Sequence, residues 1–173
     1  MIRISICGHG RCGKDTAAEY LSTITPLRYV AGTSYWARHI VFSRLPWYLR
    51  LWYWTPERAW KHRHKRRMFW AKCIGEYNRD DPVKLYRDCL ADQEILTGIR
   101  WKSEQAACRR AGIADLWVWI DRPGITIDPT MTFGQEDCDV AIVNDGTLED
   151  FHAKLRDFAS QLGILNQPIG AAA

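Results

Sequence analysis

The chain has 173 residues, of which 47% are hydrophobic and 25% charged, and its formal net charge is +4. This length suits one domain with a single core, and this composition excludes a disordered chain. Nine tryptophans are unusual for the length, and six of them fall between Trp36 and Trp70.

The first half of the chain has clear strand and helix patterns. Alternating apolar and polar residues predict a strand over residues 2–7, and apolar residues at helical spacing predict a helix over 14–24. A short second strand is expected at 27–30, and a helix at 34–45, which Pro46 interrupts. Thr55, Pro56 and Glu57 are typical of a helix start and predict one helix that runs to Tyr77.

Strands and helices alternate in the second half. Helices are expected at 80–90, 102–111 and 148–162, and strands at 94–99, 116–120 and 139–143. This alternation predicts an α/β fold with a parallel sheet covered by helices on both faces. We expect one domain over residues 1–165, with a helical insert at about 34–90 and a loose tail at 166–173.

The cysteines predict free thiols in a reducing compartment. They form no C-x-x-C pair, and their spacings fit no zinc framework. The first apolar run is too short for a signal peptide, and the apolar stretch 40–54 is broken by Arg44 and Pro46. A soluble cytoplasmic protein without a membrane partner is therefore expected. The cysteines are Cys7, Cys12, Cys73, Cys89, Cys108 and Cys138.

A glycine-rich loop between the first strand and the first helix fits the pattern G-x-x-x-x-G-K. Its glycines let backbone N–H groups surround phosphate oxygens, and Lys14 would reach the β- and γ-phosphates of ATP. The pattern indicates a P-loop phosphotransferase. The predicted nucleotide-binding residues are Gly8, His9, Gly10, Arg11, Cys12, Gly13, Lys14, Asp15 and Thr16.

The residue after the lysine departs from the usual pattern. Asp15 stands where a serine or threonine is expected, and Thr16 comes one position later. Thr16 could therefore bind Mg²⁺, while Asp15 could bind the metal through water or accept a proton from an acceptor hydroxyl.

Two further residues follow predicted strands at the edge where such sheets bind ligands. Asp121 could act as a general base or a metal ligand, or it could be a helix cap or loop residue with no catalytic role. Arg100 could stabilise the transferring phosphoryl group, or form a surface salt bridge to Glu104. The segment 122–137 lies where a lid is expected, but Arg122 is its only basic residue.

A basic segment precedes these strands. Residues 58–72 hold seven Lys/Arg, two His and no acidic residue. The spacing of Trp60, Arg63, Arg67 and Trp70 predicts that they share one side of a helix. Such a face suits phosphate contacts and base stacking, but a solvated basic helix face or an ATP-lid arginine cluster fits it equally.

Three segments carry a resemblance to a known family. The loop Gly8-x-Gly-x-x-Gly-Lys-Asp-Thr resembles that of bacteriophage deoxynucleoside monophosphate kinases. Residues 98–104 are similar to their Asp-Val-Arg-x-x-x-Glu segment, with Gly98 where the Asp is expected, and 139–148 resembles their closing strand and turn. The resemblance implies a nucleoside monophosphate kinase-like P-loop fold in which the helical insert binds the acceptor.

The insert resembles a phage subgroup related to the 5-hydroxymethyluracil DNA kinases. The resemblance lies in Arg58-x-x-x-His62-Arg63 and Trp70-x-x-x-Ile74-x-x-Tyr77-Asn78. It implies ATP- and Mg²⁺-dependent phosphorylation of 5-hydroxymethyluracil in viral DNA, as a step of thymidine hypermodification in the host cytoplasm. The expected DNA contacts are His62, Arg63, Arg66, Arg67 and Trp70.

Three functions remain open from the sequence. In the first, Lys14, Asp15, Arg100 and Asp121 catalyse phosphorylation of the modified base in DNA. In the second, the protein is a kinase for free deoxynucleoside monophosphates, and Arg63 and Arg100 clamp the acceptor phosphate. In the third, it is a nucleotide-dependent DNA-binding module without phosphoryl transfer.

Overall fold

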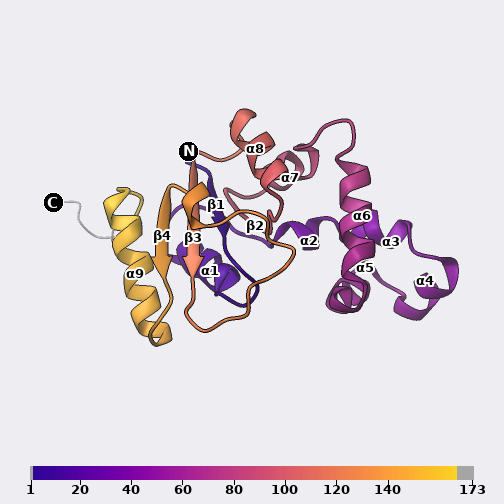
Figure 1. Ribbon diagram of the computed structural model, residues 1–173, viewed down its shortest axis with the longest axis horizontal. Helices are drawn as coiled ribbons and strands as arrows, with labels where there is room; N and C mark the ends of the chain where they lie inside the picture. Colours follow the sequence, from indigo (N-terminus) through magenta and orange to yellow (C-terminus); the bar gives the residue numbers. More distant parts are fainter. Residues whose placement is uncertain (1, 167–173) are drawn as a thin grey trace.

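The strands of the computed structural model, which describes residues 2–166, form one parallel sheet in the order β2-β1-β3-β4 (Figure 1). Every pairing is parallel, and Cys7 of the first strand lies beside Trp119 of the third. The predicted α/β fold with a parallel sheet is confirmed. The strands are β1 (Ile4–Cys7), β2 (Ile95–Thr97), β3 (Leu116–Asp121) and β4 (Val140–Val143).

Helices cover both faces of this sheet, as predicted. Ile4 and Ile6 of β1 pack in one core with α1 (Lys14–Ile24) and α9 (Leu148–Gln161). On the opposite face, Trp117 and Trp119 of β3 pack with α7 (Lys84–Cys89) and α8 (Lys102–Arg110). The side chains alternate between the two faces because successive residues of a strand point to opposite sides.

The remaining helices between β1 and β2 lie to one side of the sheet, away from α9 (Figure 1). We call residues 38–77 the helical lobe. Part of the lobe has a small core of its own around Leu45, Tyr53 and Ala59. The helices between β1 and β2, apart from α1 and α7, are α2 (Thr33–Trp36), α3 (Arg38–Ser43), α4 (Trp47–Tyr53), α5 (Pro56–Lys61), the 3₁₀ helix η1 (Arg63–Arg66) and α6 (Arg67–Tyr77).

The single helix predicted from Thr55 to Tyr77 is wrong. Thr55 does cap α5, accepting a hydrogen bond from the backbone of Arg58 at 3.2 Å. The helix then breaks at His62 and at Arg66, where φ is −134° and ψ is 35°. A continuous helix would place several like charges of this basic run three or four residues apart on one face, which destabilises it. The helix expected at 34–45 also divides, at Ala37.

The strand predicted at 27–30 is also wrong. The carbonyl of Arg28 accepts hydrogen bonds from the backbones of Glu94 and Ile95, as a strand would. However, the backbone N–H groups of Arg28 and Val30 donate to the side chains of Glu94 and Gln93, at 2.8 and 3.0 Å. These side chains replace the backbone partners that a strand ladder needs.

Other local predictions are confirmed. Thr147 caps α9, accepting from the backbone N–H of Asp150 at 3.2 Å. All six cysteines are free, and five of them are buried. Of the predicted loose tail, Asn166 donates its backbone N–H to Ile24, and residues 167–173 lie outside the described residues. Among residues 2–166, none of the helices has the length and apolar character needed to cross a membrane.

Candidate active site

The glycine loop, residues 8–13, joins β1 to α1 at the carboxyl edge of the sheet. Gly8 has φ 138°, and a Cβ there would lie 2.4 Å from the carbonyl oxygen of Ile120 in β3. Gly13 has φ 103°, and a Cβ there would lie 2.8 Å from Nδ2 of Asn144. Side chains rarely tolerate either condition, so the loop needs glycine at both positions.

Lys14 folds back into this loop. Its Nζ donates to the carbonyl oxygen of His9 at 2.5 Å and contacts Sγ of Cys12 at 3.6 Å. No side chain of the described residues caps the start of α1, so the first N–H groups of this helix can serve an anion. The loop, the helix start and the ammonium group together suit a chain of phosphates.

The carboxylate of Asp15 turns toward the end of β2. Its Oδ1 accepts hydrogen bonds from the Tyr29 hydroxyl at 2.9 Å and from Oγ1 of Thr97 at 3.1 Å. Burial raises the pKa of Tyr29 well above its usual value, and the negative charge of Asp15 raises it further. Tyr29 therefore stays protonated as a donor. Asp15 is held on the β2 side of the glycine loop.

A magnesium ion would depend on few protein groups here. Within the described residues, no three His, Cys, Asp or Glu side chains cluster as a metal site. Thr16 is half-buried in the first turn of α1, directly after Lys14 and Asp15. A hydroxyl with phosphate oxygens and water fits the oxygen ligands that Mg²⁺ prefers. Thr16 as a metal ligand stays a prediction.

A buried carboxylate from the segment between β3 and β4 lies against the glycine loop. Oδ2 of Asp128 accepts hydrogen bonds from Arg100 at 2.5 Å and from Arg67 at 2.9 Å. The backbone N–H of Asp128 donates to Nδ1 of His9 at 3.3 Å. The expected surface salt bridge between Arg100 and Glu104 is therefore wrong, because the guanidinium of Arg100 is held by Asp128 instead.

Arg63 completes a cluster of cations. Its guanidinium lies 4.4 Å from the ring centre of Trp60. Burial lowers the pKa of Arg63, and the positive charges of Arg100 and Arg67 lower it further, whereas Asp15 opposes them. Arg67 and Arg100 meet on the carboxylate of Asp128, and Arg63 lies four residues before Arg67 in the chain. We call Arg63, Arg67 and Arg100 the arginine cluster.

Asp121 lies at the carboxyl end of β3, next to Ile120, whose carbonyl faces Gly8. The backbone carbonyl of Asp121 accepts from the backbone N–H of Asn144 at 2.7 Å. The Asn144 side chain in turn donates to the carbonyl oxygen of Cys12 at 2.9 Å. Asp121 thus stands at the base of the loop, and its catalytic role stays a prediction.

The structure separates the five residues predicted to contact DNA. His62 and Arg66 are exposed, whereas Arg63 and Arg67 belong to the arginine cluster. Trp70 is only 5% exposed and belongs to the core cluster that also holds Cys73 of α6 and Tyr86 of α7. Such burial leaves little of the indole free to stack on a base, and the DNA contact of Trp70 stays a prediction. The breaks at His62 and Arg66 overturn the shared helix face predicted for this segment.

Sequence reasoning missed Asp128, Tyr29 and Thr97. Asp128 lies in a loop without a recognisable pattern, and only its contacts with Arg67 and Arg100 reveal it. Tyr29 and Thr97 are far apart in the chain, and each looked like an ordinary strand residue. The one available signal was the carboxylate of Asp15, which can accept hydrogen bonds from donors distant in the chain.

No protein-family model and no curated protein matches this sequence. Among solved structures, the chain is similar to an unliganded sugar kinase from Janibacter sp. HTCC2649. The two share 14% sequence identity with a TM-score of 0.46, and the match covers 95% of each chain. A similarity of this size carries no argument about activity. The function is therefore argued from the candidate site.

Proposed function

We propose that this protein transfers the terminal phosphoryl group of ATP to a hydroxyl group on a DNA base, 5-hydroxymethyluracil. The observation that carries the proposal is the carboxylate of Asp15. It directly follows Lys14, yet Tyr29 and Thr97 hold it on the β2 side of the glycine loop. A carboxylate held there can accept a proton from an acceptor hydroxyl.

Each residue of the site has its own role in such a reaction. The loop amides and Lys14 bind the phosphates, and Thr16 contributes an oxygen ligand to Mg²⁺, which neutralises phosphate charge. The acceptor oxygen forms a bond to the γ-phosphorus while the bond from that phosphorus to the bridging oxygen breaks, and ADP leaves. Asp15 takes the hydroxyl proton, and Arg100 stabilises the charge on the transferring group.

The helical lobe supports a polymeric acceptor. Residues 58–72 contain seven Lys/Arg without an acidic residue, and His62 and Arg66 lie exposed beside the arginine cluster. Such a surface attracts the phosphates of a nucleic acid. A target base within a duplex must be unpaired before its hydroxymethyl group reaches the glycine loop.

The arginine cluster favours a second candidate, the phosphorylation of a free deoxynucleoside monophosphate. Arg67 and Arg100 meet on one carboxylate, Asp128, in an arrangement that a phosphate could also fill. In this reaction the acceptor oxygen belongs to a phosphate, so Asp15 would not need to remove a proton from an alcohol.

Transfer of label from γ-labelled ATP distinguishes these functions. The acceptors are DNA containing 5-hydroxymethyluracil, the same DNA with thymine, and the free deoxynucleoside monophosphates. We expect label only on the modified DNA. Label on a free monophosphate would favour the second candidate, and ATP binding without label on any acceptor would indicate a binding module.

Two substitutions on α1 test the role of Asp15. Asp15→Asn keeps the shape of the side chain but cannot accept the proton, so we expect kcat to fall about 100-fold or more with ATP binding retained. Glu19→Gln removes an exposed carboxylate one turn further along the helix and is the matched control. Equal rates for both variants would remove Asp15 from the chemistry.

A further inference from the structure

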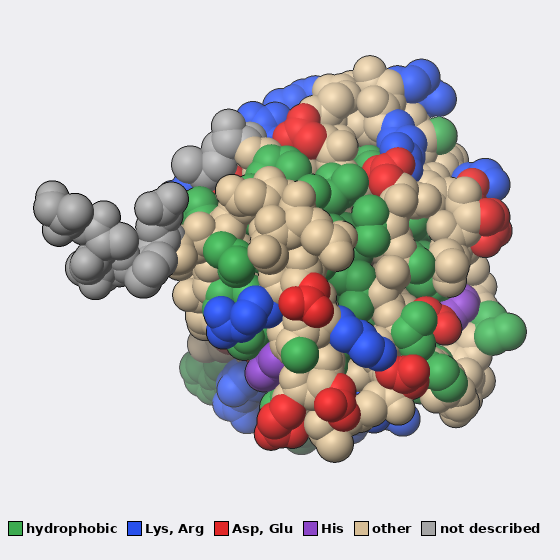
Figure 2. All heavy atoms as spheres, turned by 90° about the vertical axis from the view of Figure 1, so that its left-hand side faces the viewer, with side chains coloured by type: hydrophobic (Ala, Val, Ile, Leu, Met, Phe, Trp, Pro, Cys, Tyr) green, Lys and Arg blue, Asp and Glu red, His purple; other side chains and the backbone are tan. Residues whose placement is uncertain are grey.

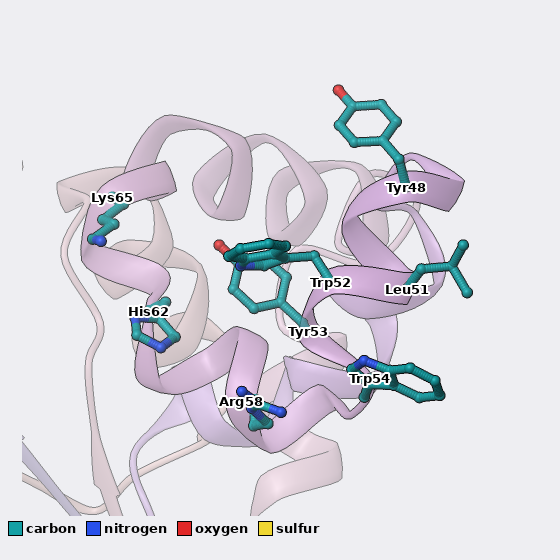
Figure 3. A pocket seen from close by; sticks show the side chains of 8 residues that line it. All are labelled: Tyr48, Leu51, Trp52, Tyr53, Trp54, Arg58, His62 and Lys65. Carbon is teal, nitrogen blue, oxygen red and sulfur yellow. The ribbon is translucent and has the colours of Figure 1, made fainter.

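An open pocket lies between α4 and the segment that runs from α5 into η1 (Figure 3). Its volume is about 660 Å³, within the range of ligand sites. Neither the glycine loop nor the arginine cluster lines it. The lining residues are Tyr48, Leu51, Trp52, Tyr53, Trp54, Arg58, His62 and Lys65.

Aromatic rings form one side of this pocket. Trp52 is 76% exposed and Trp54 is 73% exposed, which is unusual for the largest apolar side chain. Tyr53 is buried, and the ring of His62 stacks on it with ring centres 5.9 Å apart. Figure 3 shows the rings of Trp52 and Tyr53 lying between α4 and the residues of the opposite wall.

The backbone of Trp54 turns the chain between α4 and α5, beside the pocket. Its φ is 62° and its ψ is −37°, a positive-φ conformation that bulky side chains seldom adopt. The residue nonetheless presents its indole to solvent instead of burying it. A hydrogen bond of 2.7 Å from the backbone N–H of Thr55 to the carbonyl oxygen of Tyr53 closes this tight turn.

The opposite wall of the pocket carries positive charge. It is formed by Arg58, His62 and Lys65, and residues 47–66 contain one acidic residue, Glu57, which pairs with Arg38 outside the pocket. By contrast, the face that carries α9 mixes acidic and basic side chains (Figure 2). The pocket therefore complements an anion that also carries flat rings.

The pocket is continuous with the candidate active site along the chain. Lys65 belongs to η1, which ends at Arg66, and Arg67 at the start of α6 pairs with Asp128 beside the glycine loop. Arg63, in the same 3₁₀ helix, belongs to the arginine cluster. A run of cations thus connects the aromatic pocket with the place where phosphoryl transfer is proposed.

We infer that this pocket binds an unpaired base of single-stranded DNA, flanking the base that enters the active site. The inference rests on the proposed function for the identity of the polymer as DNA. Trp52 stacks on the base, while Arg58 and Lys65 pair with the neighbouring phosphates. Exposed aromatic and basic residues also suit a membrane surface, but a concave pocket with a cationic wall fits a base with its phosphate better than a flat bilayer.

Binding of a fluorescein-labelled oligothymidylate, measured by anisotropy without ATP, tests this inference. All measurements use the full chain with Lys14→Ala, so they are independent of phosphoryl transfer. We expect Trp52→Ala to weaken binding about 5-fold to 100-fold. The control is Trp47→Ala, on the same helix and 69% exposed, but outside the pocket lining. Circular dichroism checks that both variants fold.

Two further probes complete the test. To the parent protein, an abasic oligonucleotide should bind more weakly than oligothymidylate. To Trp52→Ala, the two oligonucleotides should bind with equal affinity. The inference is overturned if the two tryptophan variants behave alike, or if duplex DNA binds as tightly as the single strand. It is also overturned if Trp52→Ala weakens binding to anionic phospholipid vesicles but not to oligothymidylate. That result would indicate that the pocket contacts a membrane surface. A failure of phosphoryl transfer to modified DNA would instead contradict the proposed function.

Discussion

Arg100 and Asp128 form an ion pair of 2.5 Å that joins the end of β2 to the segment between β3 and β4. The side chain of Asp128 is 4% exposed, and Arg67 from the helical lobe shares the same carboxylate oxygen. One carboxylate therefore holds together the lobe, the sheet edge and, through the backbone contact to His9, the glycine loop. Breaking such a buried pair leaves uncompensated charges.

We expect Asp128→Asn to lower the free energy of unfolding by about 1–3 kcal/mol at neutral pH, because the two arginines lose their charged acceptor. Burial alone would raise the pKa of Asp128, but hydrogen bonds from Thr130 and Arg100 outweigh it and hold the pKa below its usual value. The contribution of Asp128 is therefore fully present above about pH 4 and is lost as the pH falls further. Urea unfolding at several pH values measures the difference.

Asp139→Asn is the control for this measurement. Asp139 pairs with Arg109 at 3.0 Å, with both side chains more than a third exposed. Its other oxygen accepts from the backbone N–H of Trp117 at 2.7 Å, a hydrogen bond that the amide oxygen of asparagine can keep. We expect this variant to lose less than about 1 kcal/mol. If Asp128→Asn is no less stable than Asp139→Asn at pH 7, the carboxylate of Asp128 does not organise the site.

The elements that sequence reasoning predicted well depend on local signals. The helix Lys14–Ile24 follows from apolar spacing after Gly13, and α9 follows from the cap at Thr147. Sequence also indicated the parallel sheet, because its strands alternate with helices. Each of the two helices is determined by residues within a few positions of one another, whereas the pairing of the strands joins residues as distant as Ile4 and Leu116.

The errors arise where tertiary contacts decide. Trp52 and Trp70 belong to the same aromatic, basic stretch, yet Trp52 is 76% exposed and Trp70 only 5%. No periodicity separates them, because Trp70 is buried by the core cluster that also holds residues of α7, far along the chain, whereas Trp52 has no such cover. Asp128 was missed for a similar reason, since its partners come from two distant segments.

Gly98 explains why the carboxylate expected at this position is absent. Its φ is 103°, and a Cβ would lie 2.5 Å from Oγ1 of Thr33. We expect Gly98→Ala to destabilise the protein more than Gly112→Ala. Gly112 has φ 60°, but no atom lies within 4 Å of the position that a Cβ would take there. Gly112→Ala should cost about 1–2 kcal/mol from backbone strain alone. Equal thermal unfolding of the two variants would show that the contact with Thr33 is unimportant.

The burial of Trp70 predicts a structural role. We expect Trp70→Ala to lower the free energy of unfolding by about 3–5 kcal/mol, because the cavity cannot close completely. Trp47→Ala removes an indole that is 69% exposed and should change stability little. Chemical denaturation of the two variants makes the comparison. A tolerated Trp70→Ala variant with weakened DNA binding would instead support the DNA contact predicted from sequence.

The last prediction concerns the hydrogen bond from Tyr29 to Asp15. Burial and the charge of Asp15 raise the pKa of Tyr29, so its hydroxyl stays protonated and remains a donor at neutral pH. Tyr29→Phe removes this donor, and Thr97 alone then orients the carboxylate of Asp15 at 3.1 Å. We expect kcat to fall about 10-fold to 150-fold, the equivalent of one hydrogen bond to a charged group.

The KM for ATP distinguishes orientation of Asp15 from damage to the glycine loop. Tyr29 contacts Asp15 and Thr97 but donates no hydrogen bond to the loop, whose lysine is held by His9 and Cys12. The KM should therefore stay constant while kcat falls, since the lost interaction acts on the acceptor and not on the triphosphate. A rise in KM with constant kcat would mean that the residues around Asp15 serve nucleotide binding. Asp15 would then have no part in proton transfer.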